Sequence, residues 1–346
     1  MITILQYLGG FVLLLFGAEY LVRGAVSLAR RLNVSPMVIG MTIVAYGTTS
    51  PELVVSLQAA IDGLPGISVG NVVGSNIANI LLILGASAAI FPIVVKPAAL
   101  YRDASVMAGS ALLFTALALN GNIARWQGVL MVAALVAFSL YAFQAERRRG
   151  RVNDPGDLAE ELAEEFKDPP QATWLALLSI VGGIAAVVTG AKLLVTAAVF
   201  TARFFGVGEE VIGLTIVAVG TSLPELATAV VAAFRRHSEV AVGNILGANI
   251  YNLLAIMGLV SAISPIPVPP QILVFDLWFM IGATAVLLFF LLVYGGLNRA
   301  VAILFLAGFV GYTALQYYGV EKMLTGKQAA QQVPVVTQQA LIARTN

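Results

Sequence analysis

Two glutamates, Glu52 and Glu225, carry the clearest chemical signal in the sequence, because each ends a similar run of small residues rich in oxygen. The first run reads GTTSPE from Gly47, and the second reads GTSLPE from Gly220. Each glutamate falls more than halfway along an apolar stretch, where an ionised carboxylate is costly unless a partner or a wet cavity compensates it. No Arg or Lys recurs beside them, so a bound cation is the expected counter-charge.

Backbone carbonyls are expected to add ligands to this cation site. A proline within a helix removes one backbone donor and frees the carbonyl about four residues earlier, and a nearby glycine lets the chain bend. The carbonyls of residues 45–48 and 218–221 should therefore face the cavity. Together with the threonine and serine hydroxyls they would form an all-oxygen cage.

A second repeated motif supplies side-chain amides. It reads GNVVGSNIAN from Gly70 and GNILGANIYN from Gly243. Its last asparagine lies one helical turn after the serine or alanine of the motif and on the same face, so we expect these asparagines to be ligands. The preceding asparagine could equally be a hydrogen-bonding link between helices. The residues concerned are Ser75, Asn76 and Asn79 in the first copy and Ala248, Asn249 and Asn252 in the second.

The ligand types favour a hard cation. Calcium accepts six to eight oxygen ligands in flexible geometry, whereas soft metals prefer cysteine, methionine or histidine, which both clusters lack. Two carboxylates balance one divalent ion or two monovalent ions. Such a site is suited to exchange one kind of ion for the other.

Composition excludes most other classes of protein. The 346 residues are 59% hydrophobic and 11% charged, whereas a soluble domain is about 25% charged. The absence of cysteine excludes a domain held together by disulfide bonds. A net charge of +1 lacks the excess of basic residues that a nucleic-acid-binding protein needs. The chain is therefore predicted to be an all-α integral membrane protein with the lipid bilayer around it.

Ten apolar stretches are long enough to be candidate membrane-spanning helices. They are residues 4–28, 38–61, 69–90, 105–119, 127–145, 175–201, 211–234, 240–264, 272–293 and 300–317. Five fall in each half of the chain, and residues 9–92 align without a gap to residues 182–265. Because five is odd, the second copy must lie upside down relative to the first, which predicts ten helices in two inverted five-helix repeats.

The domain boundaries and the orientation follow from the same pattern. We predict a first repeat at 1–145, with its motif region at 38–90, and a second at 173–318, with its motif region at 211–264. A charged cytoplasmic linker would occupy 146–172 and a tail 319–346. Arginine and lysine concentrate in the loops that lie inside if both termini are outside, which favours that orientation. We expect the membrane to be the inner membrane of a prokaryotic cell.

The duplicated motifs resemble the two alpha-repeats of the sodium/calcium exchanger family, in its prokaryotic form, within the cation/calcium antiporter superfamily. The resemblance implies a transporter rather than an enzyme, functional as a monomer and without a cofactor. It implies export of calcium in exchange for sodium, with the first and sixth spans sliding as a gate. A proton/calcium antiporter, or one for another divalent cation, stays an alternative because carboxylates also release protons, and a cation channel is a further one.

Site residues can be carried over from the family position by position. The resemblance implies that Glu52 and Glu225 chelate calcium with the carbonyls of Thr48 and Thr221. It implies a surrounding sodium ring that also uses both glutamates and consists of Ala45, Thr49, Ser75, Asn79, Ala218, Ser222 and Asn252. Two departures are visible: Ala248 replaces the counterpart of Ser75, and Asn252 stands where many relatives carry an aspartate. The second makes potassium co-transport less expected.

Overall fold

The computed structural model describes residues 2–32, 36–95, 97–149, 172–205 and 218–318. The chain divides into a large unit, Met1–Leu306, and a short C-terminal unit, Ala307–Asn346. The predicted linker 146–172 and the predicted tail 319–346 therefore fall almost entirely outside the described residues. So does the beginning of the predicted span 211–234.

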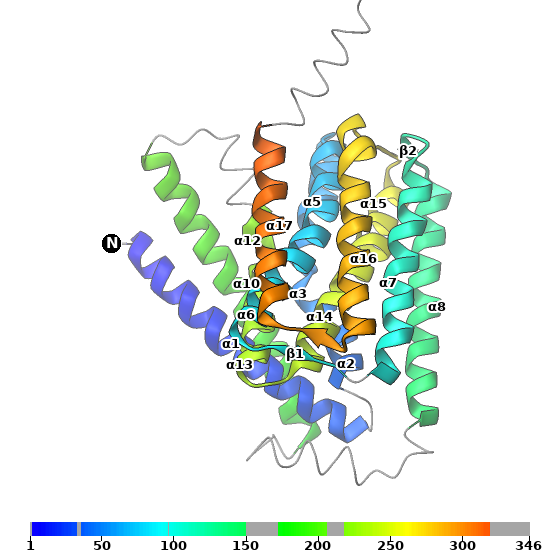
Figure 1. Cartoon of the computed structure of the whole chain (residues 1–346). Coiled ribbons are helices and arrows are strands. Elements are labelled where there is room, and N and C mark those ends of the chain that lie inside the picture. The colour runs from blue at the N-terminus through cyan, green and yellow to red at the C-terminus, as the bar shows by residue number, and fades with distance from the viewer. Residues whose placement is uncertain (1, 33–35, 96, 150–171, 206–217, 319–346) are drawn as a thin grey trace, which may run out of the picture. The chain divides into compact units, whose positions relative to one another are not determined.

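The first half of the chain is helical (Figure 1). Several helices change type within one predicted span. Labels beginning with η denote π-helical segments. The elements are α1 (Ile2–Leu32), α2 (Pro36–Ile39), η1 (Gly40–Val44), α3 (Ala45–Thr48), α4 (Ser50–Ile61), α5 (Pro65–Ala78), η2 (Asn79–Leu84), α6 (Gly85–Ile90), α7 (Pro97–Ala118) and α8 (Arg125–Arg149).

The second half follows nearly the same order of elements. They are α10 (Thr173–Phe204), α12 (Ala218–Thr221), α13 (Leu223–Phe234), α14 (Ser238–Tyr251), η4 (Asn252–Ile256), α15 (Met257–Ile263), η5 (Ile272–Asp276), α16 (Leu277–Val293) and α17 (Arg299–Tyr318). The segments η2 and η4 begin at the matched asparagines Asn79 and Asn252. The two halves therefore share their local structure as well as their motifs.

Seven helices in the described residues are long and apolar enough to cross a membrane, which confirms a multi-pass helical membrane protein. They are Ile2–Ala29, Pro65–Ile90, Arg125–Ala142, Thr173–Thr201, Ser238–Ile263, Ile272–Val293 and Arg299–Gln316. Three predicted spans are absent from this set. The span 38–61 is broken at Thr49, α7 carries Arg102 and Asp103 near its start, and 211–234 is described only in part. The total of ten stays a prediction.

Two very short antiparallel strand pairs, which the sequence does not predict, join loops of the two halves. The strand β1 (Ile93–Val94) pairs with β4 (Gly296–Leu297), and β2 (Asn122–Ile123) pairs with β3 (Ile266–Pro267). Further backbone hydrogen bonds extend both pairs, from the Val95 amide to the Gly295 carbonyl at 3.0 Å and from the Val268 amide to the Gly121 carbonyl at 2.9 Å. The loops of the first half are thus fixed to loops of the second.

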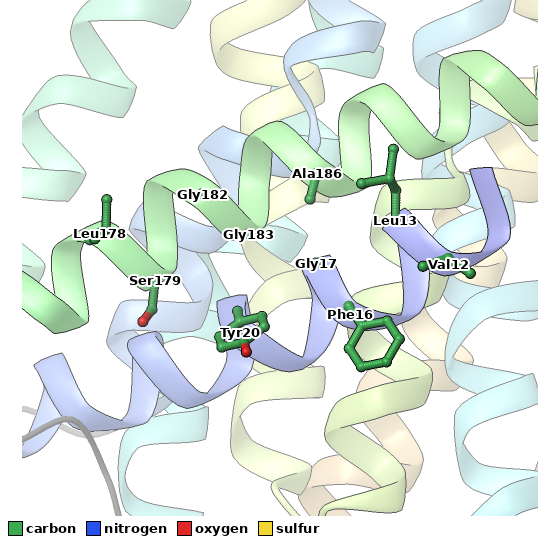
Figure 2. Close-up of a pocket in the computed structure, with 10 residues that line it drawn as sticks. All are labelled: Val12, Leu13, Phe16, Gly17, Tyr20, Leu178, Ser179, Gly182, Gly183 and Ala186. Atoms are coloured by element: carbon green, nitrogen blue, oxygen red, sulfur yellow. The ribbon is translucent and has the colours of Figure 1, made fainter. Parts of the chain in front are cut away.

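The helices α1 and α10 pack against each other along a seam of small residues (Figure 1). A Cβ atom added at Gly17 would lie 2.7 Å from the Cβ of Ala186, and one added at Gly183 would lie 2.7 Å from the Leu21 amide nitrogen. Glycine is therefore required for this close approach. Beside the crossing lies an apolar groove of about 430 Å³, lined by side chains such as Phe16 and Leu178 (Figure 2).

Candidate ion-binding site

Glu52 lies in the first turn of a helix that starts inside the predicted span. The helix α3 ends at Thr48, Thr49 takes φ −83° and ψ 2°, and α4 begins with Pro51 in its first two positions. Proline is favoured there because its missing N–H would have no helical partner and its φ suits the helix. The sequence predicts a bend at this proline, whereas the structure has a new helix N-terminus, where free amides favour a carboxylate.

The second half repeats this break at the matched position. Ser222 takes φ −88° and ψ 8°, and α13 begins with Pro224 in its first two positions and Glu225 in its first turn. Two helix N-termini in the interior of the protein therefore each present one glutamate. The equivalence predicted from the two motifs is confirmed at the level of backbone conformation.

The two carboxylates are buried and face the opposite motif. Glu52 is 1% exposed and Glu225 is 0% exposed. The Ser222 hydroxyl donates a hydrogen bond of 3.1 Å to Oε1 of Glu52, and the hydroxyls of Thr48 and Thr49 lie beside Glu225. Within the described part of the chain, Oε2 of Glu52 and both carboxylate oxygens of Glu225 have no hydrogen-bond partner. Buried polar atoms without partners call for an explanation, and a cation supplies one.

The asparagines that begin the π-helical segments add further oxygens. Asn79 donates through Nδ2 to Oδ1 of Asn249 at 2.9 Å, so its own Oδ1 is oriented elsewhere and has no partner among the described residues. Neither polar atom of Asn252 has such a partner, and this residue is 0% exposed. The structure therefore supports both as candidate ligands.

The other pair of asparagines, Asn76 and Asn249, makes hydrogen bonds to backbone and amide groups of the protein. Asn76 donates to the Val72 carbonyl at 2.9 Å, and Asn249 accepts from Asn79 while donating to the Asn76 carbonyl at 3.5 Å. Of the two interpretations that the sequence leaves open, these bonds favour the interhelical link for Asn249, whereas the Asn76 amide donates within its own helix α5.

Packing brings the predicted site residues of the two halves together. The helix α13, which carries Glu225, contacts η2, which begins at Asn79. In the same way α4, which carries Glu52, contacts η4, which begins at Asn252. Ser75 and Ala248 lie one turn earlier on α5 and α14 and are buried, as are Thr221 and Ser222. Ala218 is the first residue of α12.

Two carbonyls that are expected to face the cavity already accept hydrogen bonds. The Ala45 carbonyl accepts from the amide and the hydroxyl of Thr49, at 3.0 and 2.6 Å. The Gly47 carbonyl, which Pro51 leaves without its helical donor, accepts from the Ser50 hydroxyl at 2.8 Å. A carbonyl oxygen has two lone pairs, so the Gly47 carbonyl would offer an ion its second one, whereas the Ala45 carbonyl would have to give up a hydrogen bond from Thr49 to bind an ion.

Sequence reasoning missed Asn71 and Asn244, the first asparagine of each amide motif. Asn71 donates to the Ser56 hydroxyl at 2.9 Å and to the backbone carbonyl of Glu52 at 3.3 Å. Asn244 accepts from the Thr48 hydroxyl at 3.3 Å. Asn71 thus holds the backbone at Glu52, and Asn244 holds the side chain of Thr48. The repeat of the GN dipeptide is visible in the sequence, but its partners lie far along the chain.

Comparison with known proteins decides the family. The profile described as "Sodium/calcium exchanger protein" matches residues 2–144 and 175–318. The chain belongs to the sodium/calcium exchanger family. The resemblance drawn from the motifs is thereby confirmed, and the chain is a cation/calcium antiporter, a transporter of a family that carries sodium and calcium ions.

Individual relatives of this exchanger agree with the family match. It is 34% identical over 353 residues to the sodium/calcium exchanger MaX1 of Methanosarcina acetivorans, covering 92% of this chain and 100% of MaX1. It is 34% identical to the inner membrane protein YrbG of Escherichia coli, covering 89% and 95%. The solved structure of the sodium-calcium exchanger NCX_Mj, soaked with sodium and calcium, superposes with a TM-score of 0.78 at 28% identity, covering 91% of this chain and 98% of NCX_Mj.

Proposed function

We propose that this exchanger moves calcium out of the cell in exchange for sodium entering down its gradient, by alternating access to one site between the two halves. The observation that carries the proposal is the pair of buried glutamates, one from each half, whose oxygens lack hydrogen-bond partners within the described chain. Two carboxylates balance one calcium ion or two sodium ions, so the two cargoes compete for one charge-balanced cavity.

In this proposal calcium binds between the carboxylates of Glu52 and Glu225, with the backbone carbonyls of Thr48 and Thr221. Sodium ions occupy positions around the same carboxylates. Their ligands come from the wider ring of Ala45, Thr49, Ser75, Asn79, Ala218, Ser222 and Asn252. The unpartnered Oδ1 atoms of Asn79 and Asn252 support this assignment.

The proposed architecture has ten membrane helices in two inverted repeats, 1–145 and 173–318, joined by a cytoplasmic linker at 146–172 and followed by a tail at 319–346. The matched helix breaks and π-helical segments support it. Both termini are proposed to lie outside the inner membrane, with the exchanger acting as a monomer. The helices α1 and α10 are proposed to slide across the elements that carry the site.

The proposal is tested with the purified chain in lipid vesicles. Vesicles loaded with sodium and diluted into sodium-free buffer containing labelled calcium should accumulate calcium, and vesicles without a sodium gradient should not. Calcium uptake driven by a pH gradient alone would overturn sodium coupling in favour of a proton antiporter. Calcium flux without any counter-ion would indicate a channel.

A substitution at Ala248 tests the sodium ring. Ala248→Ser restores the hydroxyl that the first half has at Ser75, and a hydroxyl–ion or hydrogen-bond contact is worth about 0.5–1.5 kcal/mol. We expect the sodium concentration for half-maximal exchange to fall about two- to twelvefold, with the calcium dependence unchanged. Ser75→Ala should shift the sodium dependence in the opposite direction. An unchanged sodium dependence in both variants would remove these positions from the ring.

A further inference from the structure

An ion pair joins α1 to the turn that follows α13. Arg235 donates through Nε to Oε2 of Glu19 at 2.9 Å, and its Nη2 binds Oε1 of the same carboxylate. Both carboxylate oxygens are therefore engaged by one guanidinium, the strongest geometry for such a pair. Oε1 of Glu19 also accepts a hydrogen bond of 2.5 Å from Nε of Arg23, one turn along α1. Glu19 belongs to one of the two proposed sliding helices, and Arg235 belongs to the part that carries Glu225.

The turn that contains Arg235 has a matched copy in the first half, with the same backbone conformation. Arg235 takes φ −84° and ψ 4°, and Asp62 at the end of α4 takes φ −74° and ψ 2°. The next residues, Arg236 and Gly63, have φ of 60° and 74°. Asp62 and Arg235 therefore occupy equivalent places in the two halves.

The residues at the matched positions in the two halves carry opposite charges, both at the helix position and at the turn position. The counterpart of Glu19 in the repeat is Lys192 on α10, and the counterpart of Arg235 is Asp62. An acid facing a base in one half thus corresponds to a base facing an acid in the other. Reversal at only one of the two positions would have produced a pair of like charges. The complementarity is therefore kept in both halves although every sign is inverted.

Only one of the two pairs is formed in this structure. Lys192 has an exposed side chain, and Asp62 accepts a hydrogen bond of 2.9 Å from Nε2 of Gln58 on its own helix. The packing has the same asymmetry: both α1 and α10 contact α13, whereas within the described chain neither makes extensive contact with α4. The α1–α10 pair is therefore docked on the second-half element of the site.

We infer that these four residues form two alternating ion pairs that position α1 and α10 during the transport cycle. Glu19–Arg235 holds the arrangement seen here, and Lys192–Asp62 holds the equivalent arrangement in which the α1–α10 pair docks on α4. The inverted repeat places the two pairs at opposite ends of the site. When one pair is formed, the site is closed on that face of the membrane and open on the opposite face. This inference rests on the alternating access proposed above.

The chain contains no cysteine, which makes paired cysteines a direct test. The full-length variants Glu19→Cys with Arg235→Cys, and Asp62→Cys with Lys192→Cys, are placed in membranes and treated with a membrane-permeant bifunctional thiol reagent. Both pairs join the two halves of the chain. A protease site inserted within 150–171 therefore lets a gel show whether the fragments remain linked.

Both variants should cross-link, and each cross-link should arrest exchange until the reagent is removed by reduction. Adding Glu19→Gln or Arg235→Gln to the Asp62/Lys192 variant should raise its rate of cross-linking about two- to fivefold, because an exposed ion pair contributes modestly. Arg236→Gln is the matched control. It removes the same charge from the same turn, but the Arg236 guanidinium lies over the Phe91 ring, at 5.3 Å from its centre, and should leave the rate unchanged.

Two results would overturn the inference: no cross-link between positions 62 and 192 while 19 and 235 link readily, or a rate that neither Glu19→Gln nor Arg235→Gln changes. The rate of cross-linking is read out without sodium or calcium. A failure of the alternating pairs is therefore distinguishable from a failure of the proposed function, which would appear as absent sodium-dependent calcium uptake in the unmodified chain.

Discussion

Replacing either Glu52 or Glu225 with glutamine should abolish calcium exchange, lowering its initial rate by about 100-fold or more. Each substitution keeps the size of the side chain and removes one of the two negative charges at the centre of the site. Divalent calcium would then face a single buried carboxylate, and an uncompensated buried charge costs about 3–5 kcal/mol. The measurement is sodium-driven uptake of labelled calcium into vesicles.

The control is Glu239→Gln, which removes an acid from the first turn of α14, outside the site, and should retain exchange. Thermal unfolding of the purified variants would show that the two site variants still fold. Exchange retained by both Glu52→Gln and Glu225→Gln would mean that the ion site lies elsewhere. Loss in only one variant would show that the two halves contribute unequally.

Gly247→Ala should reduce exchange by about tenfold or more and lower the free energy of unfolding by about 1–3 kcal/mol, the usual cost of overpacking. A Cβ atom at this position would lie 2.6 Å from the Cα of Met41 and 2.7 Å from its carbonyl carbon. These atoms are backbone and cannot move aside alone. The α14 helix would be pushed away from η1, which weakens the 3.3 Å contact between Thr48 and Asn244.

Gly282→Ala provides the matched control. Gly282 lies inside α16 with open space around its added Cβ among the described atoms, and alanine favours a helix over glycine by about 1 kcal/mol. This variant should exchange normally with unchanged or increased stability, measured by thermal unfolding. Equal effects of the two substitutions would show that the contact between α14 and Met41 does not support the site.

The candidate site was predictable from the sequence to the extent that its determinants are local. A proline and a glutamate follow Gly-Thr within an apolar stretch, and the same pattern occurs twice, so the amino-acid sequence alone singles out Glu52 and Glu225. The buried environment and unpartnered oxygens of both residues agree with that selection. The helix break at Thr49, in place of a bend, follows from the preference of proline for the first turn.

Contacts between distant residues could not be predicted in the same way. Nothing near Asn71 in the sequence indicates that its amide binds the Glu52 carbonyl, and nothing near Glu19 indicates Arg235, because these contacts depend on how helices pack. The strand pairs were missed for a similar reason, since two residues give no alternating pattern. The second and fourth predicted spans show the limit of counting helices by hydropathy where a helix breaks, as at Thr49, or carries charge, as at Arg102 and Asp103.

The strand pairs that join loops of the two halves bear on which parts can move. Because β1 is bonded to β4 and β2 to β3, the segments around α6, α7, α15 and α16 are cross-braced by backbone hydrogen bonds, which do not depend on side-chain identity. A frame braced in this way resists shear between the repeats, although the repeats arise from separate halves of the chain. Under the proposed alternating access, the α1–α10 pair would therefore move as a unit against this braced frame.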